Sequence, residues 1–159
     1  MMFARWAAEL RGAENTLPLF SVERSNKMGG DPNIRYYHSY WRVGPSEALL
    51  IEATPPPRCV SWNFQLNNHW MESLDYRYFK IHVNKGSAVR SNPRPPTLAI
   101  SSRVAQVTLL DGTIRIVVAA EDPAIPGSNW LDTAGHAFGT DCFRWITCAS
   151  NPLAFASAL

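Results

Sequence analysis

The stretch that decides the fold is CVSWNFQLN, residues 59–67. Its large apolar residues Trp62, Phe64 and Leu66 alternate with polar ones, namely Ser61, Asn63, Gln65 and Asn67. Alternation with a period of two is typical of a β-strand that has one face in a core and one face outside it. The stretch therefore predicts a two-faced strand whose polar face is rich in carboxamides.

The same alternation recurs on both sides of this strand. Six further strands are predicted, over Tyr36–Val43, Glu47–Ala53, Tyr76–Asn84, Val104–Leu110, Thr113–Ala120 and Asp141–Cys148. The pair Asp111-Gly112 between two of them predicts a tight hairpin turn. Many short strands with turns between them and little helix predict an all-β fold, an antiparallel β-sandwich of jelly-roll type. Its predicted core consists of Trp41, Trp62, Phe64, Phe79, Ile81, Ile116, Val118, Phe143 and Trp145.

The 159 residues are enough for one ordinary domain. Residues 1–33 are predicted to hold a short helix, Phe3–Gly12, followed by a lead-in loop, Asn15–Asn33, that contains several breakers. The sandwich is expected over residues 34–148, with a loop insertion at about 87–103, and residues 149–159 are expected to form a C-terminal tail.

Charge and hydropathy exclude two classes of protein. The 15 basic residues are scattered against 13 acidic ones and form no run, so a nucleic-acid partner is not expected. The apolar runs are far shorter than the roughly 20 residues that cross a bilayer, so no membrane span is expected. The N-terminal apolar stretch meets Glu9 at once, which is not typical of a secretory signal.

Three cysteines are present, Cys59, Cys142 and Cys148. Because the count is odd and no C-x-x-C occurs, the sequence predicts neither a disulfide framework nor a zinc site, and the cysteines are interpreted as small buried packing residues. Because no disulfide framework is predicted, we expect the protein in a compartment that keeps thiols reduced. A cytoplasmic location is therefore expected, and organelle targeting is left open.

Catalytic and cofactor motifs are absent from the sequence. The four histidines, His38, His69, His82 and His136, lie in separate segments, and no metal site or cofactor is predicted. In NWLDTAGH, Asp132 and His136 are candidates for a general base oriented by a carboxylate. The interpretation we favour is a turn, because Asn, Asp, Thr and Gly at such density bond their own backbone.

The most distinctive feature is the set of side chains on the polar faces of the predicted strands. Tyrosine together with asparagine and glutamine suits contact with a polar ligand or another protein, whereas a solvated face is usually richer in Lys, Glu and Thr. A plain solvated face remains the alternative. The residues predicted to bind a ligand or partner are His38, Tyr40, Asn63, Gln65, Asn67, Tyr76, Tyr78 and His82.

Five segments carry a resemblance to a known family. They are MGGDPNIRYYHSYWRV, EALLIEA, WNFQLNNHWMESLDYRYFKIHVNK, DGTIRIVVAAEDP and NWLDTAGHAFGTDCFRWI, in this order between residues 17 and 146. The chain resembles the C-terminal β domain of the domain of unknown function 1214 family. That resemblance implies a jelly-roll-like sandwich, often preceded by a further β domain, and implies no settled activity. The passage after VNK is longer here than is usual in that family, by about 15 to 20 residues.

Three functions of different classes remain open at this point. The chain is a module that binds a small polar or amphipathic ligand, or an interaction domain that docks an upstream β domain, another subunit or itself. Alternatively it is an enzyme of hydrolase or isomerase type that uses His38, His82 or His136 with Asp132 or Asp75 in a jelly-roll pocket. Because the recognisable catalytic motifs are missing, the sequence favours binding over catalysis.

Overall fold

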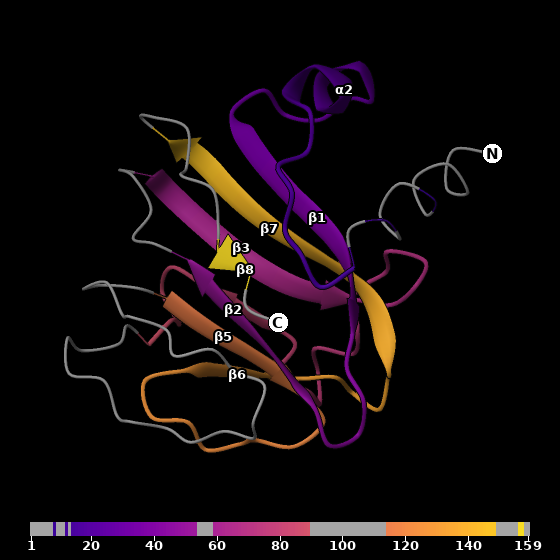
Figure 1. Ribbon diagram of the computed structural model, residues 1–159. Coiled ribbons are helices and arrows are strands. Elements are labelled where there is room, and N and C mark those ends of the chain that lie inside the picture. The colour runs from indigo at the N-terminus through magenta and orange to yellow at the C-terminus, as the bar shows by residue number, and fades with distance from the viewer. Residues whose placement is uncertain are drawn as a thin grey trace.

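The structure is a computed structural model, and it describes residues 8, 12, 14–53, 59–89, 114–148 and 156–157. Two four-stranded sheets form a sandwich (Figure 1). The first contains β1 (Ile34–Arg42), β7 (Phe138–Cys148), β3 (Cys59–Asn67) and β4 (His82–Asn84), in that order. The second contains β6 (Asn129–Asp132), β5 (Ile114–Ala119), β2 (Ala48–Ala53) and β8 (Ala156–Ser157). The prediction of an all-β fold is confirmed, and its jelly-roll part stays a prediction.

The second sheet is mixed rather than purely antiparallel, because β6 runs parallel to β5. The segment NWLDTAGH, residues 129–136, was expected to form a turn. A turn does follow Asp132, whose carboxylate accepts a hydrogen bond from the Ala134 N–H, but residues 129–132 form a strand, so the prediction is wrong for that half. The Asn129 amide donates to the Arg115 carbonyl at 2.8 Å, and the Trp130 indole donates to the Ala119 carbonyl at 3.0 Å. Two side chains thus fasten this short segment along β5, which the local turn composition could not reveal.

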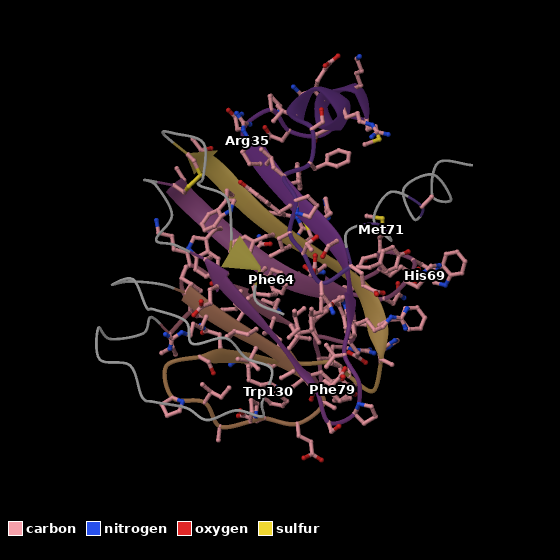
Figure 2. The ribbon with its side chains drawn as sticks, viewed as in Figure 1. Arg35, Phe64, His69, Met71, Phe79 and Trp130 are labelled. Carbon is pink, nitrogen blue, oxygen red and sulfur yellow. A yellow bond between two sulfur atoms is a disulfide. The ribbon has the colours of Figure 1, made fainter. Side chains whose placement is uncertain are left out.

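The core between the sheets is dominated by aromatic side chains from β3 and β7. The Phe143 ring lies 4.5 Å from the Trp145 ring and 5.6 Å from the Trp62 ring, measured between centroids. Phe64 lies in the middle of the molecule, between the two sheets (Figure 2). Every predicted core residue except Phe79 is buried, so that part of the core prediction is confirmed.

Phe79 is 39% exposed, because the strand predicted over Tyr76–Asn84 begins only at His82. The Asp75 carboxylate accepts hydrogen bonds from the Arg77 main-chain N–H and from the Arg77 guanidinium. The Phe79 N–H then closes a turn onto the Asp75 carbonyl at 3.1 Å. An aspartate that bonds the backbone two residues later is a strong turn former, and here it outweighs the period-two pattern.

A short helix, α2 (Val22–Lys27), lies inside the segment predicted to be a lead-in loop, beside the beginning of β1 (Figure 1). The Ser21 hydroxyl caps it by accepting a hydrogen bond from the Arg24 N–H. Glu23 and Lys27 form an ion pair one turn apart, at 2.7 Å. The capping serine followed by this pair is the signal that the sequence analysis missed.

The lead-in segment also pairs with the edge of β1. The Asn15 N–H donates to the Tyr40 carbonyl at 2.7 Å, the Phe20 N–H donates to the Tyr36 carbonyl at 2.8 Å, and Leu19 forms a bridge with Tyr37. At the other end of the chain, β8 adds to the edge of β2, so the stretch predicted to be a tail supplies a strand. Edges of sheets are commonly covered in this way.

A disulfide joins Cys59 at the start of β3 to Cys148 at the end of β7, and Figure 2 shows it as a yellow bond. The prediction that no disulfide forms is therefore wrong. The two residues face each other in the register of neighbouring strands but are 89 positions apart in the sequence. No spacing rule links cysteines so far apart, because only the pairing of β3 with β7 brings them together.

Several expectations lie outside the described residues. They are the helix Phe3–Gly12 apart from residues 8 and 12, the strand Val104–Leu110, the turn at Asp111-Gly112 and most of the insertion at 87–103. In the part of the chain that the structure describes, no helix is both long and apolar enough to cross a membrane.

Candidate functional site

The candidate site lies on the outer face of the β1-β7-β3-β4 sheet, the side turned away from the aromatic core. Strand register places its side chains in rows. One row is His38, Cys142, Gln65 and His82, and the next is Tyr36, Arg144, Asn63 and Asn84. The face therefore brings together six of the predicted residues: His38, Tyr40, Asn63, Gln65, Asn67 and His82.

Tyr76 and Tyr78 do not belong to this face. They lie in the turn that follows Asp75 and are 67% and 79% exposed. The guanidinium of Arg77 lies 5.5 Å from the centre of the Tyr78 ring. Their position follows from the same turn that displaced Phe79, because the strand that would have aligned them with β3 is absent there.

The outer face has a buried part and an accessible part. His38, Tyr40 and Asn67 are buried, with at most 7% of their surface exposed. In contrast, Asn63 and Gln65 are half-buried and His82 is exposed. Of the six predicted residues on this face, Asn63, Gln65 and His82 form its accessible part.

Two neighbouring segments contribute to the cover of the buried part. The Phe20 ring from the lead-in segment meets His38 edge-on, with centroids 6.1 Å apart. From the loop after β3, His69 Nδ1 lies 3.0 Å from the Tyr40 hydroxyl, and the Asn68 carbonyl accepts from Thr140 Oγ1. The chain itself thus occupies this half of the face.

His38 and Cys142 form a close pair within the buried part. His38 Nδ1 lies 3.1 Å from the Asp141 carbonyl, and because a carbonyl only accepts, Nδ1 carries the proton. His38 Nε2 is then the acceptor that faces the Cys142 sulfur at 3.7 Å. This geometry resembles a thiol with its base, but burial raises the pKa of Cys142 to about 12. A thiol this buried and this weakly acidic is a packing group rather than a nucleophile.

Burial also sets the protonation state of His38, lowering its pKa to about 4. The hydrogen bond to the Asp141 carbonyl opposes that shift, and the positive charge of Arg144 adds to it. The imidazole is consequently neutral at pH 7, and it stacks on the Tyr36 ring with centroids 5.7 Å apart.

Arg144 lies beside Asn63 on the neighbouring strand, in the accessible part, and was not among the predicted site residues. Its Nη1 donates to Asn63 Oδ1 at 3.0 Å, and its side chain is half-buried. Among the described residues, acidic side chains pair with Lys27, Arg42, Arg77 and Arg115, but none pairs with Arg144. The signal for it was present in the sequence: Phe143 and Trp145 point inward, so alternation places Arg144 outward.

An aromatic cluster lies at one end of the outer face, where Phe138 begins β7. His69 contacts Trp70 and Phe138, at centroid distances of 4.9 and 6.1 Å, and the Arg42 guanidinium lies 5.2 Å from the centre of the Phe138 ring. Trp70 is 63% exposed and Phe138 is 42% exposed. Trp70 and Phe138 were not among the predicted site residues.

The predicted catalytic candidates are not brought together. The Asp132 carboxylate accepts from the Ala134 N–H at 2.8 Å, within a turn, while His136 is exposed. Across the described ranges, no hydrogen bond joins these two side chains. Asp75 is paired with Arg77, and no group of three metal-ligating side chains occurs within the described residues.

The fold and site define a two-sheet all-β protein with a polar, basic outer face. One solved structure similar to it is that of a protein from Burkholderia cenocepacia described only as uncharacterized, with a TM-score of 0.78 and 44% sequence identity. The similarity covers 98% of this chain and 38% of the other, so this chain spans well under half the length of that protein. No protein-family model matches the chain, and no curated protein matches it.

Proposed function

We propose that this chain is a binding module that holds a small polar ligand on the accessible part of the outer face. The observation that carries the proposal is the alignment of Asn63, Gln65, His82 and Arg144 in two adjacent rows on three neighbouring strands. These side chains offer hydrogen-bond donors and acceptors at fixed spacing, which is how polar groups in ligand sites give orientation and specificity.

Hydrogen bonds between neighbours hold two of these amides in place. The Gln65 amide donates to Asn67 Oδ1 at 2.9 Å, and Asn63 Oδ1 accepts from Arg144. Because their rotamers are already fixed, a ligand loses less affinity to side-chain ordering than it would on a mobile surface. Strands are also more rigid supports for a site than loops.

A titration with small molecules, followed by two-dimensional ¹H–¹⁵N NMR of the full chain, tests this proposal. The probes are glucose, glutamine, benzamide, benzoate and hexanoate. We expect at least one probe to shift the side-chain amide signals of Asn63 and Gln65. The Gln65→Ala, His82→Ala double variant should lose that response and keep its melting temperature, because both side chains are outside the core.

A Tyr76→Ala, Tyr78→Phe variant is the matched control, since both tyrosines are exposed and lie off the face. It should bind the probe as the wild type does. The proposal fails if the probes leave the Asn63 and Gln65 signals unchanged, or if the shifts map to residues away from the outer face.

A second candidate is the docking of a partner β domain on the aromatic cluster of His69, Trp70 and Phe138. Exposed tryptophan is typical of the anchor of a protein interface, and the similar Burkholderia protein contains additional chain beyond the matched part. To test this, the chain is mixed with the part of the Burkholderia protein that lies outside the match, and complex formation is measured by sedimentation velocity. Trp70→Ala should weaken the complex, while Tyr78→Ala should not.

We also propose that the chain belongs to the domain of unknown function 1214 family and has its jelly-roll-like topology. Support comes from the five long segments that follow one another in the order of that family. The Burkholderia structure, with its description as uncharacterized, adds no functional assignment.

A further inference from the structure

The accessible part of the outer face carries a positive charge that the described acidic side chains leave unpaired. We infer that Arg144 anchors a site for the carboxylate group of a small organic acid. This inference rests on the proposed function and names the class of its ligand.

The face around Arg144 carries no negative charge in the described strands. In the described strands, the side chains that share the face with Arg144 include no acidic residue. The side chains in the same row as Arg144 are Tyr36, Asn63 and Asn84, and those in the neighbouring rows are polar, aromatic, apolar or basic.

Two acidic residues that belong to the same strands or pair with them are engaged elsewhere. Asp141 precedes Cys142 on β7, and its carboxylate is held by Ser39 on the core side of the sheet. Glu14 pairs with Arg42 at 2.8 Å, three rows away from Arg144. Three rows correspond to about 20 Å along a strand, since two residues rise about 6.8 Å. The field at Arg144 therefore favours an anion.

Hydrogen-bond donors outnumber acceptors around the Arg144 guanidinium. A guanidinium has five N–H donors and no acceptor, and Arg144 uses one of them on Asn63 Oδ1. Since that oxygen accepts, the Asn63 amide nitrogen remains as a further donor beside the guanidinium. A carboxylate can accept hydrogen bonds from both groups at once. Such bonds between charged groups are short and strong.

The shape and charge of Arg144 suit a carboxylate better than a phosphate. The planar fork of a single arginine matches a carboxylate with two parallel hydrogen bonds. A phosphate monoester carries up to two charges near pH 7, which one arginine does not balance. The neighbouring amides are neutral, and His38 is also neutral because burial lowers its pKa to about 4. One positive charge beside neutral donors suits a monoanion.

The hydrogen bond to Asn63 also prepares the site. Arg144 is half-buried, so part of its hydration is already lost, and its position is set by a side chain of the neighbouring strand. A carboxylate that arrives then replaces water at a fixed guanidinium, which reduces the ordering cost of binding.

The experiment compares acids with amides of the same carbon skeleton, titrated into the full chain and followed by NMR. The pairs are benzoate with benzamide and hexanoate with hexanamide. We expect each acid to shift the Arg144 Nε–Hε and Asn63 side-chain signals, with an affinity at least tenfold above its amide. Arg144→Gln should abolish this preference, and Arg144→Lys, which keeps the charge without the fork, should weaken it several-fold.

The control variant is Arg35→Gln, which removes the same charge from half-buried Arg35 on β1, next to Tyr36 in the chain. It should bind the acids as the wild type does. Equal loss in Arg35→Gln and Arg144→Gln would mean a net-charge effect and would overturn the inference. Stronger binding of inorganic phosphate than of either acid would overturn it too.

Two results separate this inference from the proposed function. If the amides bind the face as tightly as the acids, the proposed function stands and the inference of a carboxylate site is overturned. No response to acid or amide, together with none to glucose or glutamine, removes both proposals. If Arg144→Gln fails to fold, judged by its melting temperature and NMR spectrum, the Arg144→Lys variant decides: an unchanged preference for acids over amides would overturn the inference.

Discussion

Ser39 and Asp141 form a closed hydrogen-bonded pair across β1 and β7, on the core side of the first sheet. The Ser39 N–H donates to Asp141 Oδ1 at 2.9 Å, and the Ser39 hydroxyl lies 3.0 Å from Oδ2. Both residues are at most 1% exposed. Burial raises the pKa of Asp141 to about 8, and the two hydrogen bonds from Ser39 only partly oppose that shift.

Asp141 should therefore make the protein less stable at alkaline pH. The folded state keeps the proton up to about pH 8, whereas the unfolded chain releases it near its ordinary pKa of 3.8. The contribution of this group is thus full below pH 4 and is lost as the pH rises towards 8. Asp141→Asn keeps an acceptor for Ser39 and cannot titrate, so its stability relative to the wild type should rise over this range.

The measurement is urea unfolding of both proteins at pH 5, 6.5, 8 and 9. The difference in unfolding free energy between them should change by an amount on the order of a few kcal/mol. Ser39→Ala should shift the stability at every pH, because it removes a hydrogen-bond partner and leaves the carboxyl group. A difference that is constant with pH would show that Asp141 titrates normally.

His38 should act in the opposite direction, at acidic pH. Its pKa of about 4 in the folded state lies below the ordinary value of 6.5, so protonation favours the unfolded chain. The stability that depends on neutral His38 is present above pH 6.5 and is lost as the pH falls towards 4. His38→Gln should be less stable than the wild type at pH 7.5 and less sensitive to acid.

An NMR titration of the His38 ring checks this expectation directly. The ring signals of His38 should change only as the pH falls towards 4. If His38 titrates near pH 6.5, the imidazole is solvated and the described packing against Tyr36 and Phe20 is not present in solution.

Loss of the Cys59–Cys148 disulfide should lower the stability substantially. The bond spans 89 positions, and a disulfide that closes a loop of that size in the unfolded chain adds about 2 to 5 kcal/mol to the stability of the folded state. The Cys59→Ser, Cys148→Ser double variant should unfold at a lower guanidinium concentration than the oxidised wild type. A reducing agent should affect the wild type and leave this variant unchanged.

Cys142→Ser is the matched control, because Cys142 is buried and not part of the disulfide. It should keep its sensitivity to reducing agent. Thiol counting on the unfolded, unreduced protein should find a single free cysteine, and three free thiols would exclude the bond. The same count on protein isolated from cells tests the expected reducing, cytoplasmic location, since such compartments keep thiols reduced.

Trp62 and Phe79 should differ sharply on truncation. Trp62 is 1% exposed and packs against Phe143 and Trp145, so Trp62→Ala should cost about 3 to 5 kcal/mol. Phe79 is 39% exposed in a turn, so Phe79→Ala should cost about 1 kcal/mol or less. Chemical unfolding of both variants measures these losses. Similar losses for the two would mean that residues 76–81 continue as a strand into the core.

Much of the fold followed from alternation. The strand predicted over Cys59–Asn67 has the same bounds in the structure, and the strands around Tyr36–Val43, Glu47–Ala53 and Asp141–Cys148 differ only at their ends. Alternation failed at Tyr76–Phe79, because the Asp75 side chain accepts a hydrogen bond from the backbone there and forms a turn. Such local hydrogen bonds compete with a hydrophobic pattern and are difficult to weigh from the pattern alone.

The candidate site was predictable only in part. The carboxamide face of β3 is visible in the sequence, because Asn63, Gln65 and Asn67 are two positions apart. Its division into a buried and an accessible half was not, because the cover includes Phe20 and His69, which lie on other segments. Arg144 was also missed, since its importance depends on the lack of an acidic neighbour on strands far apart in the chain.

The sequence by itself determined which residues alternate, and so which side chains enter the core and which face outward. A strand has a period of two whatever it pairs with, so this information is local. Register and strand order were decided only by the tertiary structure. They place Cys59 opposite Cys148, Arg144 beside Asn63 and Asp132 in a strand parallel to β5. Such pairings depend on the packing of the whole sandwich, because each joins positions that no local pattern connects.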